Sequence, residues 1–184
     1  MQYSALAETI RGITLIQEAD SLPTIYCDMD GVLCDFKKRA EQVTKVSWTK
    51  KRDERDWDTI KNTKNFWHTL PWTSDGRRLW SYIKIHKPSI LSATVQAKTD
   101  PNCRPGKDYW IKNNLGIYDG TRVNIVLRSQ KQKHAMLSHK GRREPAVLID
   151  DYPKNIREWQ RKGGIGILHT SASSTISQLR KLGY

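Results

Sequence analysis

The stretch that most constrains the fold is a short apolar run leading into closely spaced carboxylates. Ile25-Tyr26-Cys27 has the pattern of a buried strand, and Asp28 and Asp30 follow it directly, ahead of Gly31. In an open α/β sheet, ligands bind beyond the carboxyl ends of the strands, which is where both aspartates would lie. We expect one carboxylate to face the cleft from the strand end and the other to lie in the turn that Gly31 permits.

Two carboxylates this close repel each other, so the pair needs an explanation. A surface Asp-x-Asp-Gly turn is one. An EF-hand calcium loop is excluded: counting from Asp28, Val32 and Leu33 occupy the positions of an oxygen ligand and a glycine, and Arg39 replaces the closing glutamate. The interpretation that fits is a hard-cation site whose metal offsets the repulsion and leaves one carboxylate free to react.

A second strand end repeats the same chemistry. Residues 146–149 are apolar and run into Asp150 and Asp151. Parallel strands would bring this acidic pair to the same edge of the sheet as the first one. Together the two pairs offer oxygen ligands to a hard cation and leave the remaining positions to water and substrate phosphate, as Mg²⁺ prefers.

The rest of the chain alternates strand and helix patterns. Further strands are expected at residues 89–93, 123–127 and 165–169, with helices between them, including one that opens after residue 128 and runs through Leu137. This alternation predicts a single α/β domain over residues 1–184, with a parallel sheet of about five strands and helices on both faces. Residues 4–17 would form a packing helix. The charged, tryptophan-containing segment 37–72 would form a small helical cap over the site.

Charge and composition narrow the ligand class. The formal net charge is +13, so phosphorylated metabolites, nucleotides and nucleic acids are all plausible anionic ligands. Hydrophobic residues make up 37% of the chain, and no apolar run has the length of a membrane span. The three cysteines show no metal-binding spacing, and the charged N-terminal residues do not fit a signal peptide. We therefore expect reduced thiols, a cytoplasmic location and no membrane partner. The sequence does not indicate an oligomeric state.

The motif Asp28-x-Asp30-Gly31-x-x-x-Asp35 resembles the first motif of the haloacid dehalogenase-like phosphatases. The resemblance implies a Rossmann-like sheet, Asp28 as the nucleophile that attacks phosphorus and Asp30 as general acid and base. It also implies that Mg²⁺ is bound by Asp28, Asp30 and Asp150. Asp151 would then support these ligands from behind.

The later motifs of that family have counterparts in order along the chain. Ser92, which ends the second strand, would donate to a phosphoryl oxygen, with Ala93 beside it. A lysine after the third strand would neutralise the phosphoryl group and the nucleophile. Lys131 fits this place best by its distance from the strand, and Lys133 is the alternative.

A narrower resemblance is to the 5′(3′)-deoxyribonucleotidases and similar phage and bacterial nucleotidases. It depends on the aromatic Phe36 after the first motif, on Asn65-Phe66-Trp67, and on Cys103-Arg104-Pro105 leading to Lys107 and Trp110. It implies a magnesium-dependent nucleotidase that forms an aspartyl phosphate. Phe36 and Trp67 would stack on the nucleoside, while Ser92, Ala93 and Lys131 would contact the phosphate.

Two other functions stay open. A polynucleotide 3′- or 5′-end phosphatase would explain the basic charge, because lysines and arginines could follow a phosphate backbone. A non-catalytic nucleic-acid-binding protein on the same scaffold belongs to another class. Asp28 and Asp30 count against it, since binding needs neither carboxylate and both repel phosphate.

Overall fold

The computed structural model describes residues 22–48, 54–139 and 142–184. The packing helix predicted over residues 4–17 lies outside them. In the described part, no helix combines the length and apolar character needed to cross a membrane.

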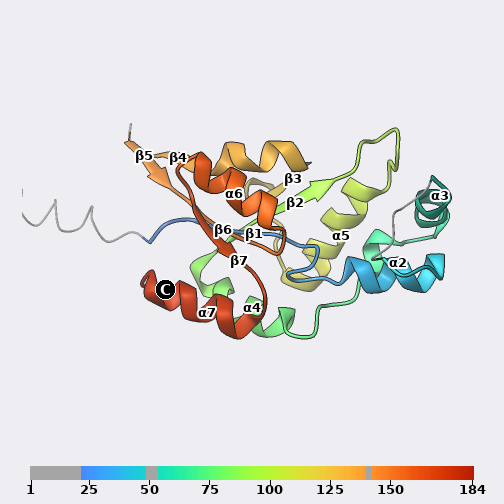
Figure 1. Cartoon of the computed structure of the whole chain (residues 1–184), viewed down its shortest axis with the longest axis horizontal. Helices are drawn as coiled ribbons and strands as arrows, with labels where there is room; N and C mark the ends of the chain where they lie inside the picture. Colours follow the sequence, from blue (N-terminus) through green and yellow to red (C-terminus); the bar gives the residue numbers. More distant parts are fainter. Residues whose placement is uncertain (1–21, 49–53, 140–141) are drawn as a thin grey trace, which may run out of the picture.

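Five parallel strands form the central sheet, as predicted, in the order β3-β2-β1-β6-β7 (Figure 1). They are β1 (Ile25–Cys27), β2 (Ser89–Thr94), β3 (Val123–Leu127), β6 (Val147–Asp150) and β7 (Ile165–Leu168). In the register, Cys27 pairs with both Ile90 and Ile149, so the central strands end near one level. From β1 the chain adds β2 and β3 on one side and then β6 and β7 on the other. The crevice at this reversal of strand order is where such sheets bind ligands.

Alternating side chains of the strands supply two hydrophobic layers. Ile25, Cys27 and Ile149 belong to the larger cluster, whereas Tyr26 and Leu148 belong to the smaller one. The larger layer is covered by three helices, and the smaller one by a helix and a 3-10 segment. They are α4 (Gly76–Ile83), α5 (Cys103–Leu115) and α7 (Ala172–Lys181) on one side, and α6 (Pro153–Arg161) and η4 (Arg128–His134) on the other. The sheet is thus buried on both faces, which explains why its strands read as continuous apolar runs.

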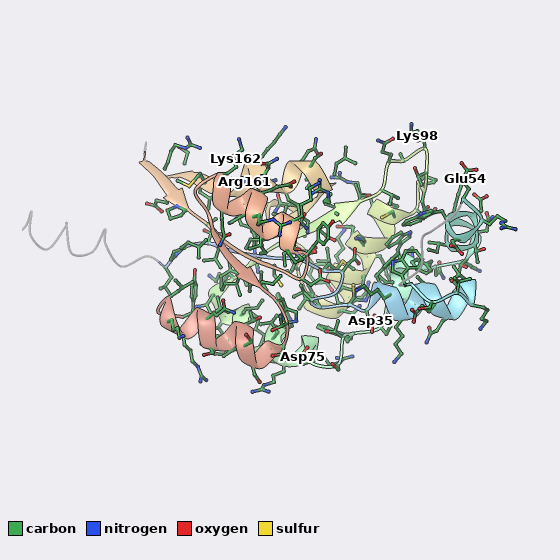
Figure 2. All side chains as sticks on the ribbon, viewed as in Figure 1. Asp35, Glu54, Asp75, Lys98, Arg161 and Lys162 are labelled. Atoms are coloured by element: carbon green, nitrogen blue, oxygen red, sulfur yellow. The ribbon has the colours of Figure 1, made fainter. Side chains whose placement is uncertain are left out.

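The segment between β1 and β2 begins with α2 (Phe36–Thr44), α3 (Glu54–Asn62) and the 3-10 turn η1 (Trp67–Thr69). Figure 1 shows α2 and α3 at one end of the molecule, beyond the carboxyl ends of the strands, and Figure 2 shows Asp35 and Glu54, at the starts of these helices, at the same end. Their apolar positions are few, and an aromatic cluster around Phe36 packs them onto the domain. That residues 37–72 act as a cap remains a prediction. Two further 3-10 turns are η2 (Lys84–His86) and η3 (Gly120–Arg122).

The helix predicted from residue 128 through Leu137 is wrong. The 3-10 segment η4 ends at His134, and an antiparallel hairpin of β4 (Met136–His139) and β5 (Arg142–Pro145) follows. A hydrogen bond of 2.9 Å from Ala146 N to Ala135 O closes the base of this hairpin, which is separate from the main sheet. Backbone pairing within this hairpin therefore overrides the helical preference of the short apolar run.

Candidate active site

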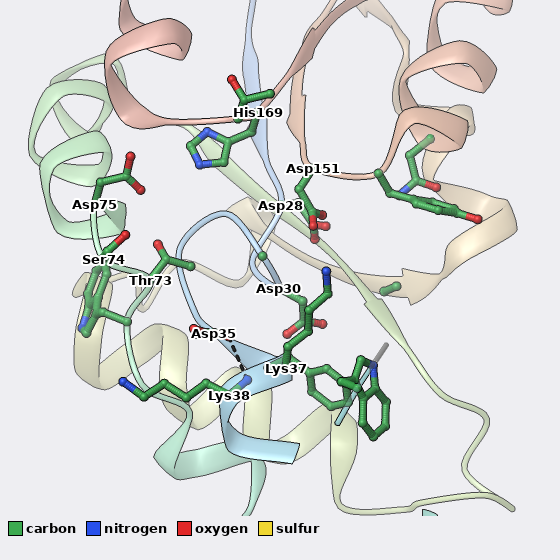
Figure 3. Close-up of a pocket in the computed structure, with 18 of the residues that line it drawn as sticks. Asp28, Asp30, Asp35, Lys37, Lys38, Thr73, Ser74, Asp75, Asp151 and His169 are labelled. Carbon is green, nitrogen blue, oxygen red and sulfur yellow. Dashed lines mark hydrogen bonds between the residues drawn. The ribbon is translucent and has the colours of Figure 1, made fainter. Parts of the chain in front are cut away.

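A cavity of about 890 Å³ opens at the carboxyl ends of the central strands. Figure 3 shows Asp28, Asp30 and Asp151 at its centre, where β1 and β6 end. The order of the strands brings these carboxylates together from positions more than a hundred residues apart. The expectation that both acidic strand ends meet at one edge of the sheet is confirmed.

Asp28 is held in place by its own strand end and by a buried lysine. Its backbone N–H donates to Ile149 O at 2.8 Å, and its Oδ1 accepts from Met29 N at 2.7 Å. Lys131 Nζ lies 2.9 Å from Asp28 Oδ2. The Lys131 side chain is only 2% exposed, whereas Lys133, the alternative site lysine, is exposed. The structure thus brings Lys131, from η4, to the first aspartate.

Asp150 is saturated by protein partners. Its carboxylate receives Lys131 Nζ at 2.7 Å, Asn155 Nδ2 at 3.0 and 2.9 Å, and Tyr152 N at 2.9 Å. Burial alone would lower the pKa of Lys131, but Asp28 and Asp150 outweigh it and raise that pKa. Lys131 therefore stays charged between the two carboxylates. Asp150, predicted as a metal ligand, is placed so that it orients Lys131.

The donor set fits a hard cation. Asp28, Asp150 and Asp151 each offer a carboxylate oxygen within 4.8 Å of the others. Burial, with added repulsion from Asp150, raises the pKa of Asp151 to about 6. Burial also raises the pKa of Asp28, with Lys131 opposing. Burial and mutual repulsion thus destabilise the ionised form of these carboxylates. A divalent cation, which prefers oxygen ligands, would offset that repulsion. Asp28 and Asp151 would hold such a cation, because the Asp150 oxygens already accept from Lys131, Asn155 and Tyr152.

Gly31 makes room for Asp151. Its φ is +80°, and a Cβ atom at this position would stand 2.6 Å from Asp151 Cγ and closer still to Oδ2. No side chain fits between the turn after β1 and the end of β6. The glycine predicted only to permit a turn thus also lets the second acidic pair approach the first.

Asp30 faces a different lysine. Lys107, on α5, forms an ion pair with Asp30 and hydrogen bonds to Ser92 Oγ at 3.0 Å and to Ala93 O at 2.6 Å. Burial alone would lower the pKa of Lys107, but the Asp30 carboxylate outweighs it and raises that pKa. From the sequence alone, Lys107 is only part of a family pattern, and no role is predicted for it. Its spacing could have indicated burial, because Lys107 lies on the same face of the helix as Cys103 and Trp110, which are both buried.

The end of β2 presents Ala93, and not Ser92, to the cavity. Ser92 is fully buried, and its hydroxyl lies against Lys107. Ala93 lines the cavity, as expected for a residue beside the phosphate. The predicted contact between Ser92 and a phosphoryl oxygen remains untested.

The aromatic side chains that line the cavity are those of Phe36, Trp48, Trp72 and Tyr152. Trp67, predicted to stack on substrate, lies behind Phe36 in the core, with ring centroids 5.4 Å apart and planes 16° from parallel. Its indole N–H donates to buried Asp100 at 2.6 Å. Trp67 therefore supports Phe36 from behind, and sequence reasoning missed the exposure of Trp48 to the cavity.

The cavity rim is mostly polar and partly basic. Lys37 and Lys38, in the first turn of α2, line it, as does Arg128, which pairs with Glu158 at 2.9 Å. Figure 3 shows Asp75 and His169 on the wall across from Lys37. The cavity thus combines a carboxylate centre, an aromatic side and cations able to attract a phosphate.

No family model and no curated protein sequence matches the chain. Among solved structures, a hydrolase from Streptococcus pneumoniae TIGR4 is similar, with 13% identity, a TM-score of 0.45, and coverage of 88% of this chain and 97% of that chain. A hydrolase from Pseudomonas syringae follows, with 15% identity, a TM-score of 0.41 and coverage of 87% and 90%. The HAD hydrolase, family IA, variant 3 from Entamoeba histolytica HM-1:IMSS shares 12% identity over 87% and 89%, with a TM-score of 0.39. Likenesses this distant decide neither the family nor the activity.

Proposed function

We propose that the protein is a magnesium-dependent phosphomonoesterase of the haloacid dehalogenase-like type that acts on nucleoside monophosphates. One observation carries the proposal. A buried aspartate at the end of the central strand lies 2.9 Å from a buried lysine, and in a cluster of carboxylates that fits a metal. The resemblance of the sequence motifs to those phosphatases supports the same reading.

In this mechanism Asp28 attacks phosphorus in line, the bond to the leaving oxygen breaks, and an aspartyl phosphate forms. Asp30 gives its proton to the leaving oxygen, then takes one from the water that cleaves the intermediate. Lys131 stabilises negative charge on the nucleophile and on the transferred phosphoryl group. A magnesium ion bound by Asp28 and Asp151 would add Lewis-acid stabilisation of that charge.

The nucleotide assignment is supported by what surrounds the carboxylates. Phe36 and Trp48 offer aromatic surface to a base, and Phe36 is backed by the stacked ring of Trp67. Lys37 and Lys38 add positive charge to the cavity lining. A cavity of about 890 Å³ is in the range of sites that enclose a whole small molecule.

A second candidate substrate is the phosphorylated end of a polynucleotide. The observation in its favour is a basic stripe on α6, whose first residues border the cavity. Lys154, Arg157 and Arg161 are exposed along this helix, and its acidic Glu158 pairs with Arg128 at 2.9 Å and with Lys154 at 4.0 Å. Cations spaced along a helix at a cavity mouth could contact successive backbone phosphates.

The deciding experiment is phosphate release from a panel of nucleoside monophosphates, sugar phosphates and oligonucleotides phosphorylated at the 3′ or 5′ end. We expect turnover of nucleoside monophosphates in the presence of magnesium, and its loss in Asp28→Asn. Asp119→Asn, at an exposed aspartate of η3's N-terminal cap, is the matched control and should retain activity. Near-normal activity of Asp28→Asn would refute the covalent mechanism, and a strong preference for oligonucleotides would favour the second substrate.

A further inference from the structure

The site contains two buried lysines, and they serve different aspartates. Lys131 contacts Asp28 and Asp150, whereas Lys107 contacts Asp30. They come from different elements, α5 and η4, which lie on opposite faces of the sheet. The mechanism proposed above uses only Lys131, so the position of Lys107 calls for a separate explanation.

Lys107 is built into the structure. Its side chain is 1% exposed, and the ammonium group has three oxygen partners, on Asp30, Ser92 and Ala93. An ammonium group has three N–H donors, so these partners saturate it. A buried lysine is costly unless it is paired and hydrogen-bonded in this way. The three partners lie on two separate elements, the turn after β1 and the end of β2.

Helix α5, which carries Lys107, can reach the site because the preceding residue, Gly106, has no side chain. A Cβ atom on Gly106 would stand 2.5 Å from Trp67 Cβ, so only glycine allows α5 to lie this close to η1. Trp67 also contributes its ring, whose centroid is 5.2 Å from Lys107 Nζ. The contact between α5 and η1 thereby fixes the base of the lysine, while the three oxygens fix its tip.

We propose that Lys107 is the positioning residue of this site, which ties the Asp30 carboxylate to the end of β2 and so sets where Asp30 meets the leaving oxygen. The inference rests on the proposed phosphatase function. Asp30 is partly exposed on the cavity side, with a side chain 28% accessible, and Cys34 Sγ is a second, weak partner at 3.4 Å. Without Lys107 the carboxylate would be free to rotate on its turn. Lys107 itself is not among the residues that line the cavity.

The first test is Lys107→Met, which keeps the length of the stem and removes the ammonium group. We expect kcat to fall about 10²-fold, because proton transfer by a positioned group contributes about 10²–10⁴-fold, with KM changed less than about threefold. Lys112→Met is the matched control on the same helix, where Lys112 makes only an exposed ion pair with Asp108 at 2.6 Å. An unchanged kcat in Lys107→Met overturns the proposal.

A double-mutant cycle separates positioning from general damage. If Lys107 acts through Asp30, Lys107→Met should cost less than about threefold when Asp30 is already replaced by Asn. An equal loss in both backgrounds would refute the coupling. Should Lys107→Met not fold, Ser92→Ala removes one of its anchors instead. It should lower kcat about fivefold at constant KM, and no change would count against the proposal.

A crystal structure of Lys107→Met adds a readout that does not depend on activity. The expected result is an Asp30 carboxylate turned away from the end of β2, with Asp28 and Lys131 unmoved. An unmoved Asp30 overturns the inference. A wild-type protein that releases no phosphate from any substrate overturns the proposed function, and the structure of the variant still shows whether Lys107 places Asp30.

Discussion

Replacing Gly31 by alanine tests the closest approach in the site. Two costs are expected from one methyl group. The first is conformational, because the φ of +80° places this residue in a region that L side chains adopt at a cost of about 1–2 kcal/mol. The second is steric, because the new Cβ would stand 2.6 Å from Asp151 Cγ. The carboxylate that we assign to the metal would have to move.

Gly116 separates the two costs. It ends α5 with a φ of +66°, and among the described residues nothing lies within 4 Å of a Cβ built there. Gly116→Ala should therefore carry the conformational cost alone. At about 2–4 °C per kcal/mol for a chain of this length, its Tm should fall about 2–8 °C. The Tm of Gly31→Ala should fall at least as far.

The distinguishing measurement is magnesium affinity by titration calorimetry. Displacing Asp151 should weaken binding about 10–100-fold in Gly31→Ala, the range seen when the surroundings of metal ligands are disturbed. Gly116→Ala should bind magnesium like the wild type. Equal affinity in the two variants would refute the assignment of Asp151 as a ligand held beside Gly31.

Four further outcomes are expected. Phosphate release should stop in excess EDTA and return with Mg²⁺, and undiminished hydrolysis in EDTA would refute the metal assignment. Asp151→Ala should raise the magnesium requirement with little loss of stability. Asp150→Ala should lower the free energy of unfolding in urea by about 3–5 kcal/mol, because it removes a buried partner of Lys131. A larger loss of stability in Asp151→Ala than in Asp150→Ala would exchange the two roles. Because the pKa of Asp151 is raised to about 6, its carboxyl is mostly protonated at pH 5 and ionised at pH 8, so Mg²⁺ should raise Tm more at pH 8; a larger shift at pH 5 would contradict this. In a salt series, kcat/KM for a nucleoside monophosphate should fall modestly, while a log–log slope near −0.7 for each phosphate contacted would indicate a single-stranded polynucleotide.

Patterns within single segments were enough to predict the frame of the molecule. Each strand of the main sheet is a short apolar run, and burial on both faces is what makes such runs continuous. The acidic strand ends needed no knowledge of packing either, because parallel strands place their carboxyl ends at one edge. Asp28, Asp30 and Asp151 therefore lie together on the cavity as their strand-end positions predict.

Which acidic residue pairs with a lysine and which faces the cavity depended on tertiary structure. Asp150 and Asp151 are neighbours in sequence, yet one is saturated by Lys131, Asn155 and the Tyr152 backbone, while the other faces the cavity. Successive side chains at a strand end point in different directions. Which of them meets a lysine depends on how η4 packs against α6 and β2, and the order of adjacent residues carries no information about that packing.

The same reason explains what sequence reasoning missed. Local pattern shows whether a residue is apolar, charged or at a strand end, and this determined the sheet and its acidic edge. It does not show which distant backbone approaches. The close contact of Gly106 with Trp67 carries Lys107 to Asp30, and the pairing of Met136 with Pro145 turns an expected helix into a hairpin. The first depends on a contact between segments far apart in the chain. The second depends on pairing between two neighbouring strands, which the pattern of either segment alone does not show.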